Sequence, residues 1–431
     1  MPSRSDSAIR DAVGSVLAIP RLNQLARELG VVKRQRKVRV LALVGAVVLG
    51  FSTGAERTLA GIRRAYERTT GQTLAASGFY ARFSRELVQL LKQLVEDAIR
   101  QLQEQTPRLK HALSRFEQVL VADGSLIQLH RSLARHYPSV FPNKMGAGAK
   151  LHVVINVAGR SARSVQITSG SRHDSTILKV GSWVRGKLLI LDLAYRKGLL
   201  YKRIAEHGGY FLLRKKDSDD PVIVDAPWCG KRLSTVEHEF VGRAIDVMAL
   251  VPWHLDRGNK RRRLMPVRLV GQWHPTERRH RFYVTNAPQD MMATDHVGPI
   301  YAARWEVELF FRELKLTHRL EQLPTRKRFV AEALIYAALL SLLVSRRLHK
   351  LLRANHPSHP ERWARLFAIF ALDILEVLLA PRSSGLGRRL LRVLRREAPD
   401  PNRNRPTLLQ RAQLVSAGLF EVLGHFRLAA N

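Results

Sequence analysis

The sequence predicts a mixed β-sheet of the α/β or α+β class flanked by helices, with a β-rich insertion and helical regions at both ends of the chain. Three observations support this fold class. Apolar residues recur with helical spacing up to about residue 117 and again after residue 300. Runs rich in aliphatic and β-branched residues follow one another between residues 116 and 215. Further strand-like runs occupy residues 217–295.

Residues 1–117 are expected to form a separate helical N-terminal unit. Periodic segments such as Arg57–Arg68 and Ser84–Glu104 predict helices. Leu22–Gly30, followed by the basic run Lys33–Arg39, resembles a helix, a Gly turn and a basic helix, as in a helix-turn-helix module. We therefore expect this region to bind DNA, although many plain helical hairpins share the pattern.

Residues 118–216 have three strands in sequence, and then a helix, a strand, a helix and a strand. His173 and Asp174 stand before Ser and Thr, as at a helix N-cap, and a later helix is expected around Leu199–Glu206. This order is that of an RNase H-like core, of which these residues would form the first part. The predicted strands are Phe116–Ala122, Lys150–Val157, Ser164–Thr168, Lys187–Leu191 and Tyr210–Lys215.

Residues 217–295 interrupt this order and predict a β-rich insertion. Its loop Arg257–Arg263 has five cations in seven residues, more than a hairpin tip needs for solubility. A phosphate contact through Arg261, Arg262 and Arg263 is the simplest use of such a loop. The predicted strands of the insertion are His238–Val251, Leu264–Trp273 and Arg281–Asn286.

Residues 296–355 return to helical spacing and would form the second part of the core. Residues 356–431 are expected to be a helical C-terminal region that could mediate dimerisation. The predicted helices from here to the end of the chain are Val330–Leu351, Glu361–Leu379, Leu386–Arg396 and Leu408–Leu423.

The charge of the chain indicates a polyanionic partner. The 72 Lys and Arg against 36 Asp and Glu give a formal net charge of +36. Nucleic acid, a ribosome and an anionic membrane all satisfy this condition. The longest apolar runs, Val40–Phe51 and Ala333–Val344, are shorter than the roughly 20 residues that span a bilayer, and no secretory signal is visible. We therefore expect a cytoplasmic protein without a membrane partner.

A single cysteine, Cys229, rules out an internal disulfide and a Cys-rich zinc site within one chain. With Trp228 and Gly230 beside it, Cys229 is expected to be a packed or turn residue.

The segment from residue 301 to residue 315 has the most informative spacing in the chain. On an α-helix, Tyr301, Arg304, Glu308 and Lys315 lie within a stripe roughly 60° wide. This places one carboxylate among cations and a phenol, which is a catalytic geometry.

A plainer alternative is an amphipathic helix whose charges lie in water. The same arithmetic places Glu306 and Glu313 well outside the stripe, so Glu308 is the acid that would act with it. In the plainer alternative the residues that pack inward are Trp305, Leu309, Phe310 and Phe311.

Two further acids end apolar strands, Asp123 after Val119–Ala122 and Asp192 after Lys187–Leu191. Taken singly, Asp123 could belong to an Asp-Gly turn and Asp192 could cap a helix. Three convergent carboxylates could instead hold two divalent cations for phosphodiester cleavage. Hard oxygen ligands suit Mg²⁺, for which Mn²⁺ can substitute.

Asp123, Asp192 and Glu308, with the spacing Tyr-x2-Arg-x3-Glu-x6-Lys, resemble the DDE transposases of bacterial insertion sequences that have this motif. The resemblance covers roughly residues 116–350. It implies that metal-activated water nicks the element end and that the freed 3′-hydroxyl attacks the opposite strand, which gives a hairpin before insertion into target DNA. The three acids would be the catalytic metal ligands.

The resemblance also implies DNA contacts. Arg304 and Lys315 would hold phosphates near the cut and Tyr301 would orient one of them. An aromatic residue of the insertion, Trp253 or Trp273, would receive a flipped base, although most tryptophans are simply core residues. Two element ends need two active sites, so we expect a homodimer on double-stranded DNA at the nucleoid.

One departure from the family leaves the subgroup and its hairpin route open. The family often has Arg-Gly-Tyr after the second Asp, whereas this chain has Leu-Ala-Tyr195. Two rival functions also remain: a host RNase H-like nuclease that cuts DNA without joining it, and a transposition-inactive repressor that only binds the ends. A ribosomal or chromatin-packing protein would explain the charge but not the three acids.

Overall fold

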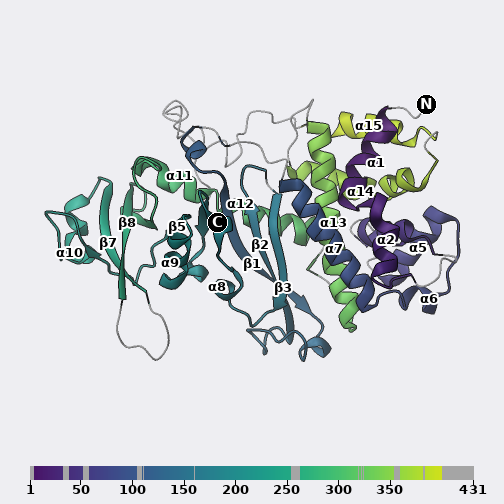
Figure 1. The fold of residues 1–431 in the computed structure, drawn as a ribbon, viewed down its shortest axis with the longest axis horizontal. Coiled ribbons are helices and arrows are strands. Elements are labelled where there is room, and N and C mark those ends of the chain that lie inside the picture. The colour runs from purple at the N-terminus through teal and green to yellow at the C-terminus, as the bar shows by residue number, and fades with distance from the viewer. Residues whose placement is uncertain are drawn as a thin grey trace.

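The chain folds into a nine-stranded sheet joined to a body of helices, as the computed structural model shows (Figure 1). The predicted fold class, a mixed sheet with flanking helices, is confirmed. The residues that the structure describes are 4–32, 38–51, 58–103, 109, 111–159, 161–253, 263–318, 320–321, 323, 325–353, 360–381 and 384–399.

Five strands form the RNase H-like part of the sheet, in the order β3-β2-β1-β4-β5. Strands β1, β2 and β3 pair antiparallel, whereas β4 lies parallel to both β1 and β5. A parallel pair needs a crossover, and helix α9 (Gly198–Glu206) supplies it between β4 and β5. The bounds of the strands are β1 Val119–Leu129, β2 Ala147–Asn156, β3 Ser161–Ser169, β4 Leu188–Leu191 and β5 Tyr210–Arg214.

The insertion extends the same sheet instead of forming a separate one. Strand β9 pairs antiparallel with β5, and β8, β7 and β6 follow outward. The predicted strand at His238 begins later, because residues 237–240 form a helical turn. Cys229 is exposed in a turn, as expected. The bounds are β6 Val222–Ile223, β7 Ile245–Trp253, β8 Arg263–His274, β9 Arg279–Thr285 and, between β6 and β7, helix α10 Leu233–Val236.

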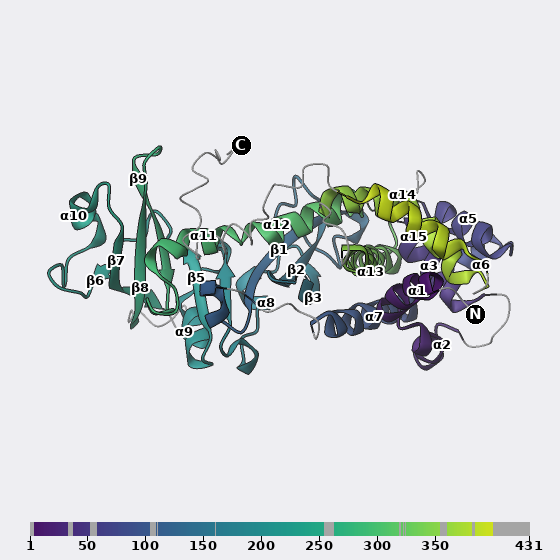
Figure 2. The ribbon, with the colours of Figure 1, turned by 90° about the horizontal axis from the view of Figure 1, so that it is seen from above.

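The N-terminal and C-terminal helices pack together at the end of the molecule beyond β3 (Figures 1 and 2). Their apolar side chains form one core, which includes Ile9, Leu91, Leu340 and Leu391. The N-terminal helices therefore share their core with the C-terminal helices. The bounds are α1 Arg4–Val16, α2 Ile19–Glu28, α3 Val40–Gly45, α5 Leu59–Thr70, α6 Ala76–Tyr80, α7 Arg85–Gln103, α13 Arg328–Arg353, α14 Pro360–Leu379 and α15 Leu386–Glu397.

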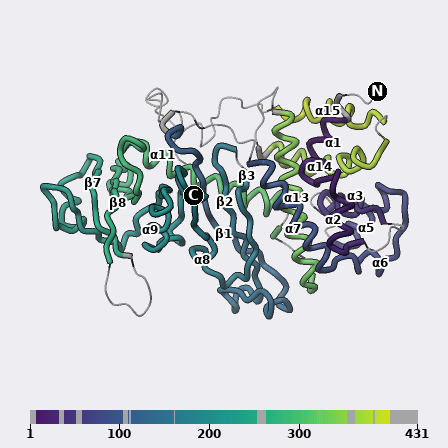
Figure 3. Tube along the Cα trace, viewed as in Figure 1, coloured from purple at the N-terminus to yellow at the C-terminus, as the bar shows by residue number. Residues whose placement is uncertain are grey.

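This helical core continues onto one face of β1 and β2 through residues such as Val121 and Val153, while a second core covers the opposite face. The second core joins Leu120 and Leu191 to Ile204 of α9 and reaches Leu269 of the insertion. Figure 3 shows the first and the last described helices, α1 and α15, near each other on the helical side of the sheet. The sheet is thus held from both faces, which fixes the positions of the residues at the strand ends.

The predicted helix-turn-helix is described in part. Helix α2 includes Leu22, and Gly30 has φ +75°, a left-handed turn that suits Gly. Arg39 is extended, and α3 begins at Val40 with mostly buried residues. Residues 33–37 of the basic run and the predicted helix Leu408–Leu423 lie outside the described residues. DNA binding by residues 1–117 therefore stays a prediction.

Helix α13 is the one helix of the described part of the chain that is long and apolar enough to cross a bilayer. It extends well beyond the apolar run Ala333–Val344 and is two residues longer at each end than the predicted helix Val330–Leu351. However, 83% of its most apolar window is buried inside the protein. Helix α13 is therefore the central helix of the helical body.

Candidate active site

Two of the predicted acids leave adjacent parallel strands at the same level. Ala122 of β1 pairs with Leu191 of β4, and Asp123 and Asp192 are the next residues. Since neighbouring strands lie roughly 5 Å apart, the two carboxylates start close together. The sequence predicted that the strand would end at Asp123. Strand β1 instead continues to Leu129, with β2 as its partner. The acid pair therefore lies where β4 ends and β1 loses its second neighbour.

The surroundings of Asp123 disfavour its charged form. Burial is the largest cause and, together with the negative charge of Asp192, raises the pKa of Asp123 to about 6. A hydrogen bond from the Gly124 backbone N–H to Asp123 Oδ1, at 2.7 Å, and the positive charge of Arg304 oppose this rise. Neither simple alternative applies, because Asp123 lies in a strand and the Asp192 side chain makes no capping hydrogen bond.

The motif segment is not the single straight helix that the 60° stripe assumed. Helix α11 (Val297–Ala302) ends at a tight turn, in which Arg304 N–H donates to Tyr301 O. Helix α12 (Trp305–Arg312) follows, and residues 313–317 continue as a π-helical turn. A π turn holds more residues than an α turn, so the angle of Lys315 relative to Tyr301 cannot be read from regular helical spacing.

Glu308 and Arg304 form an ion pair one helical turn apart. Arg304 Nη2 lies 2.5 Å from Glu308 Oε1, and both side chains are partly exposed. Burial alone would lower the pKa of Arg304, but Tyr301, Glu308 and Asp192 together raise it. The guanidinium therefore pairs with the acid on α12 and is also stabilised by the negative charge of Asp192.

The other two acids of the segment, Glu306 and Glu313, do not take part in the Arg304–Glu308 ion pair. Glu306 is buried, and Glu313 pairs with Arg346 of α13 at 2.7 Å. Trp305 is 47% exposed, so the simple amphipathic alternative, in which it packs inward, is wrong for this residue.

A metal ion would find two of its three predicted ligands side by side. The mutual repulsion of Asp123 and Asp192 is the situation that a hard cation relieves. Glu308, however, is held by Arg304, and among the described residues no three His, Cys, Asp or Glu side chains are arranged to hold one ion. The acid pair thus fits a divalent cation, whereas Glu308 would first have to leave its arginine.

Tyr301 packs on an aromatic residue of β9, whereas Lys315 lies on the π-helical turn after α12. The Tyr301 ring is 5.2 Å from the ring of Tyr283 on β9, and burial raises its pKa to about 12. Its phenol also interacts with Arg304 and Asp192. Lys315 is half-buried on the π-helical turn, where no carboxylate of the described residues pairs with it.

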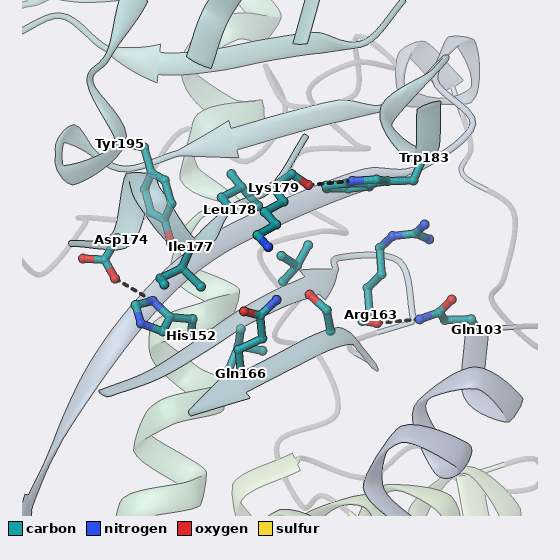
Figure 4. Close-up of a pocket in the computed structure, with 13 residues that line it drawn as sticks. Gln103, His152, Arg163, Gln166, Asp174, Ile177, Leu178, Lys179, Trp183 and Tyr195 are labelled. Atoms are coloured by element: carbon teal, nitrogen blue, oxygen red, sulfur yellow. Dashed lines mark hydrogen bonds and ion pairs between the residues drawn. The ribbon is translucent and has the colours of Figure 1, made fainter. Parts of the chain in front are cut away.

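A second polar cluster beside Asp123 was missed by the sequence interpretation. Asp174 is buried and pairs with Lys150 and with His152, whose Nδ1 lies 3.0 Å from Asp174 Oδ1 (Figure 4). Burial alone would raise the pKa of Asp174, but these two partners hold it below its usual value. His173, by contrast, caps α8 (Asp174–Ile177) as predicted, because its side chain accepts from Ser175 N–H.

Gly124 explains why Asp174 can lie so close to the acid pair. A Cβ atom at this position would collide with Asp174 Oδ1 and would lie 2.9 Å from Lys150 Cε. The available signal in the sequence was the alternation of Lys150 and His152, which places both on one face of β2. Their acid partner, however, is more than 20 residues away in the chain.

The two tryptophans proposed to receive a base lie far apart. Trp253 pairs with Arg263 at the tip of the β7–β8 hairpin, whereas Trp273 pairs with His280 of β9. The ten positions of β8 between Arg263 and Trp273 correspond to roughly 33 Å. The two residues therefore cannot line one pocket. Arg261 and Arg262 lie outside the described residues, and Arg263 is exposed.

Known transposases are similar to this chain in sequence. The family model of the transposase DDE domain matches residues 114–344, more than half of the chain. Transposases for the insertion sequences IS231F and IS231B of Bacillus thuringiensis are 23% and 21% identical over 362 residues, which is 75% of this chain and 76% of theirs. A transposase for IS1151 of Clostridium perfringens is 18% identical over 365 residues, which is 76% of this chain and 77% of the relative.

The matched residues contain all three predicted acids, the first part of the RNase H-like core and most of the second part. DDE transposases cleave DNA and use divalent metal ions in general. The chain belongs to the family of transposases with a DDE domain.

Proposed function

We propose that this protein is the transposase of an insertion sequence of the group with the Tyr-x2-Arg-x3-Glu-x6-Lys motif. It would cut DNA at the ends of the element and transfer the freed 3′-hydroxyl strands into target DNA, by a cut-and-paste route with a hairpin intermediate. The observation on which the proposal rests is the pairing of Ala122 with Leu191, because it brings Asp123 and Asp192 out of adjacent strands together.

Asp123, Asp192 and Glu308 would hold two Mg²⁺ or Mn²⁺ ions. These cations would activate water and stabilise the negative charge on the leaving oxygen. For Glu308 to contribute, Arg304 must release it, and a DNA phosphate is the natural new partner for the guanidinium. Substrate binding would thereby free the third ligand.

The remaining residues of the motif would hold the DNA. Lys315 has no acidic partner among the described residues and would contact a phosphate, while the Tyr301 phenol, fixed against Tyr283, would orient one. Trp273 is closer than Trp253 to the site, since it lies three positions along β8 from Val270, the partner of Tyr283. We therefore favour Trp273 as the aromatic residue that receives a flipped base.

The protein would act as a homodimer on two element ends in the cytoplasm, at the nucleoid. Exposed arginines on α15, at positions 388, 389, 392, 395 and 396, support binding of DNA by the helical body. Residues 1–117 and the loop Arg261–Arg263 would add further phosphate contacts, with dimerisation through residues 356–431.

A second function has one observation in its favour. In the described chain Glu308 is paired with Arg304, and no three ligands surround one ion. A protein locked in this arrangement would bind the ends and repress without cutting. A host nuclease that cuts without joining is the remaining alternative.

The decisive experiment uses labelled DNA with the inverted ends that flank the gene, incubated with the purified protein and Mg²⁺, Mn²⁺ or EDTA. Metal-dependent nicking and strand transfer are expected in the wild type but not in Asp123→Asn, Asp192→Asn or Glu308→Gln, all of which should still bind. Glu376→Gln, whose acid pairs with Arg68 in the helical body, is the matched control. Binding without cutting would establish the repressor, and cutting without joining the nuclease.

A further inference from the structure

A pocket of about 370 Å³ lies against β2 and β3, next to the candidate active site but outside its predicted residues. This volume lies within the range of small-ligand sites. Figure 4 shows an acidic end with Asp174 and Tyr195, an aromatic and cationic end with Trp183 and Arg163, and Lys179 between them.

The Arg163 side chain is a half-buried cation without an acidic partner among the described residues. Its guanidinium carbon lies 5.1 Å from the centre of the Trp183 ring. Its Nη1 donates a hydrogen bond, at 3.5 Å, to the neutral amide oxygen of Gln118, and no carboxylate of the described residues forms an ion pair with it. Burial lowers its pKa. A desolvated cation without an acid is the usual design of an anion site.

Trp183 offers an aromatic surface whose orientation is fixed. Its Nε1–H donates to Lys179 O at 2.9 Å, while the side chain remains partly exposed at the pocket. If the Arg163 guanidinium moved onto a phosphate, the ring face beneath it would become free for a base. Gln103 is also fixed, since its Nε2 donates to Arg163 O at 2.7 Å, and the exposed Gln166 adds a second amide.

The pocket reaches close to the acid pair, because Asp174 at its acidic end lies against Gly124, the residue after Asp123. The charge of Asp174, at its acidic end, raises the pKa of Asp123, and the Tyr195 phenol interacts with Asp123 and Asp192 as well as with Asp174. A ligand in the pocket would therefore be adjacent to a phosphate bound at Asp123.

We propose that this pocket binds one unpaired nucleotide of the DNA strand, next to the phosphate that is cut and separate from the flipped base proposed for Trp273. The base would pack on Trp183, and its phosphate would contact Arg163 and Lys179. A nucleotide within a duplex cannot enter, because its base is stacked and paired, so the pocket selects DNA that is opened at this point. The proposal rests on the proposed function for its choice of DNA as the ligand.

The test measures binding by the full chain in EDTA, so that it does not depend on cleavage. Fluorescence anisotropy compares an end duplex that has two unpaired nucleotides beside the cut with the fully paired duplex. The wild type should bind the opened DNA more tightly than the paired duplex. Trp183→Ala should lower the affinity for the opened DNA at least about fivefold, since stacking of one base contributes roughly 1–3 kcal/mol. Arg163→Ala should act in the same direction, and Trp183→Phe should retain most of the preference.

Trp228→Ala is the matched control, because Trp228 packs on Phe240 in the insertion. In the wild type, photocrosslinking of 5-iododeoxyuridine at the unpaired position should modify the peptide that contains Trp183, which tests the pocket even if a variant fails to fold. Equal affinity for both duplexes, an unchanged Trp183→Ala or a crosslink elsewhere would overturn the pocket assignment. Competition by free dTMP at equal concentration would show a mononucleotide site instead of a strand site.

Failure of the proposed function looks different in this assay. If the protein binds neither duplex, DNA is not its ligand and the transposase proposal fails with it. If it binds both equally but cuts element ends with Mg²⁺, the proposed function stands and the pocket proposal alone is wrong.

Discussion

The Arg304 guanidinium lies 2.5 Å from the Glu308 carboxylate and also interacts with Asp192 of the neighbouring strand. In the proposed metal site, this cation would compete with the metal ion for Glu308. Because an arginine and a metal ion compete for the same carboxylate oxygen, the pair can act as a switch between a resting site and a loaded one.

Arg304→Ala should make the free protein bind Mn²⁺ more tightly. The pair is partly exposed and is worth about 1 kcal/mol, so an increase in affinity of roughly threefold to tenfold is expected. Electron paramagnetic resonance of unbound Mn²⁺ measures this directly. Cleavage of element ends should nevertheless fall, since the phosphate contact is lost.

Arg328→Ala is the control for this change. It breaks another Arg–Glu pair with the same spacing, to Glu332 at 2.7 Å, on a helix away from the acid pair. Its Mn²⁺ affinity should equal that of the wild type. If Arg304→Ala also leaves the affinity unchanged, Glu308 is not a ligand in competition with Arg304.

The raised pKa of Asp123 predicts a pH dependence of metal binding. The carboxylate must be ionised to bind a cation, and its pKa of about 6 means that the ionised fraction falls as the pH drops through 6. Affinity for Mn²⁺ at pH 5.5 should be several-fold weaker than at pH 7.5. A titration that is flat between these values would show that Asp123 ionises normally or is not a ligand.

The raised pKa of Asp123 also affects the free energy of unfolding. A salt-bridged acid, whose pKa is lowered, makes the protein more stable as the pH rises, whereas Asp123 makes it less stable. The folded protein holds a proton on Asp123 between pH 3.8 and about 6, where the unfolded chain has released it. The free energy of unfolding therefore decreases as the pH rises through this window. At pH 7.5 without metal, Asp123→Asn should be more stable than the wild type by up to about 3 kcal/mol.

Urea denaturation of both proteins at pH 4 and pH 7.5 in EDTA measures this difference, which should shrink at the lower pH. Asp219→Asn, at a half-exposed position that pairs with Arg196, should show no such gain. A wild type that is the more stable of the two at pH 7.5 would contradict the burial argument.

The sequence was sufficient for the strand order of the RNase H-like part of the sheet, because the signals of these strands are local. The run before Asp192 and the alternation in residues 150–157 each predict a strand from neighbouring residues. The RNase H-like order then follows from their sequence along the chain. The end of β1 could not be predicted in this way, because the strand continues from Ala122 to Leu129 through its pairing with β2 after β4 has ended.

The site was predicted as a set of residues but not as an arrangement. The Arg304–Glu308 pair is compatible with the spacing, yet the spacing alone does not state whether a cation or a metal ion meets the carboxylate. The Asp174 cluster and the Trp183 pocket depend on contacts between distant segments, such as Gly124 against Asp174. No periodicity within one segment contains that information.

Gly124→Ala should impair the site by steric means alone. The added methyl group would collide with Asp174 Oδ1, and the Lys150 side chain leaves no room on the other side. Overpacking of this kind costs about 1–3 kcal/mol and would displace Asp174 from His152. Urea denaturation should show the loss, and Mn²⁺ affinity should fall because the acid pair moves.

Gly78→Ala is the matched control for this substitution. Gly78 lies in helix α6, where an added Cβ would meet nothing within 4 Å, so the change should be neutral or stabilising by up to about 1 kcal/mol. A Gly124→Ala protein as stable as Gly78→Ala would show that Asp174 relaxes freely and has no fixed position beside Asp123.

Lys315→Ala should weaken binding to element ends and reduce the dependence of that binding on salt by about one phosphate contact. The argument is that Lys315 lies half-buried on the π-helical turn after α12, where no acid of the described residues neutralises it. Fluorescence anisotropy in EDTA between 50 and 200 mM salt gives the slope of log Kd against log salt. Lys202→Ala, which removes an exposed cation paired with Glu206 on α9, should leave that slope unchanged. Equal slopes for Lys315→Ala and the wild type would remove Lys315 from the DNA interface.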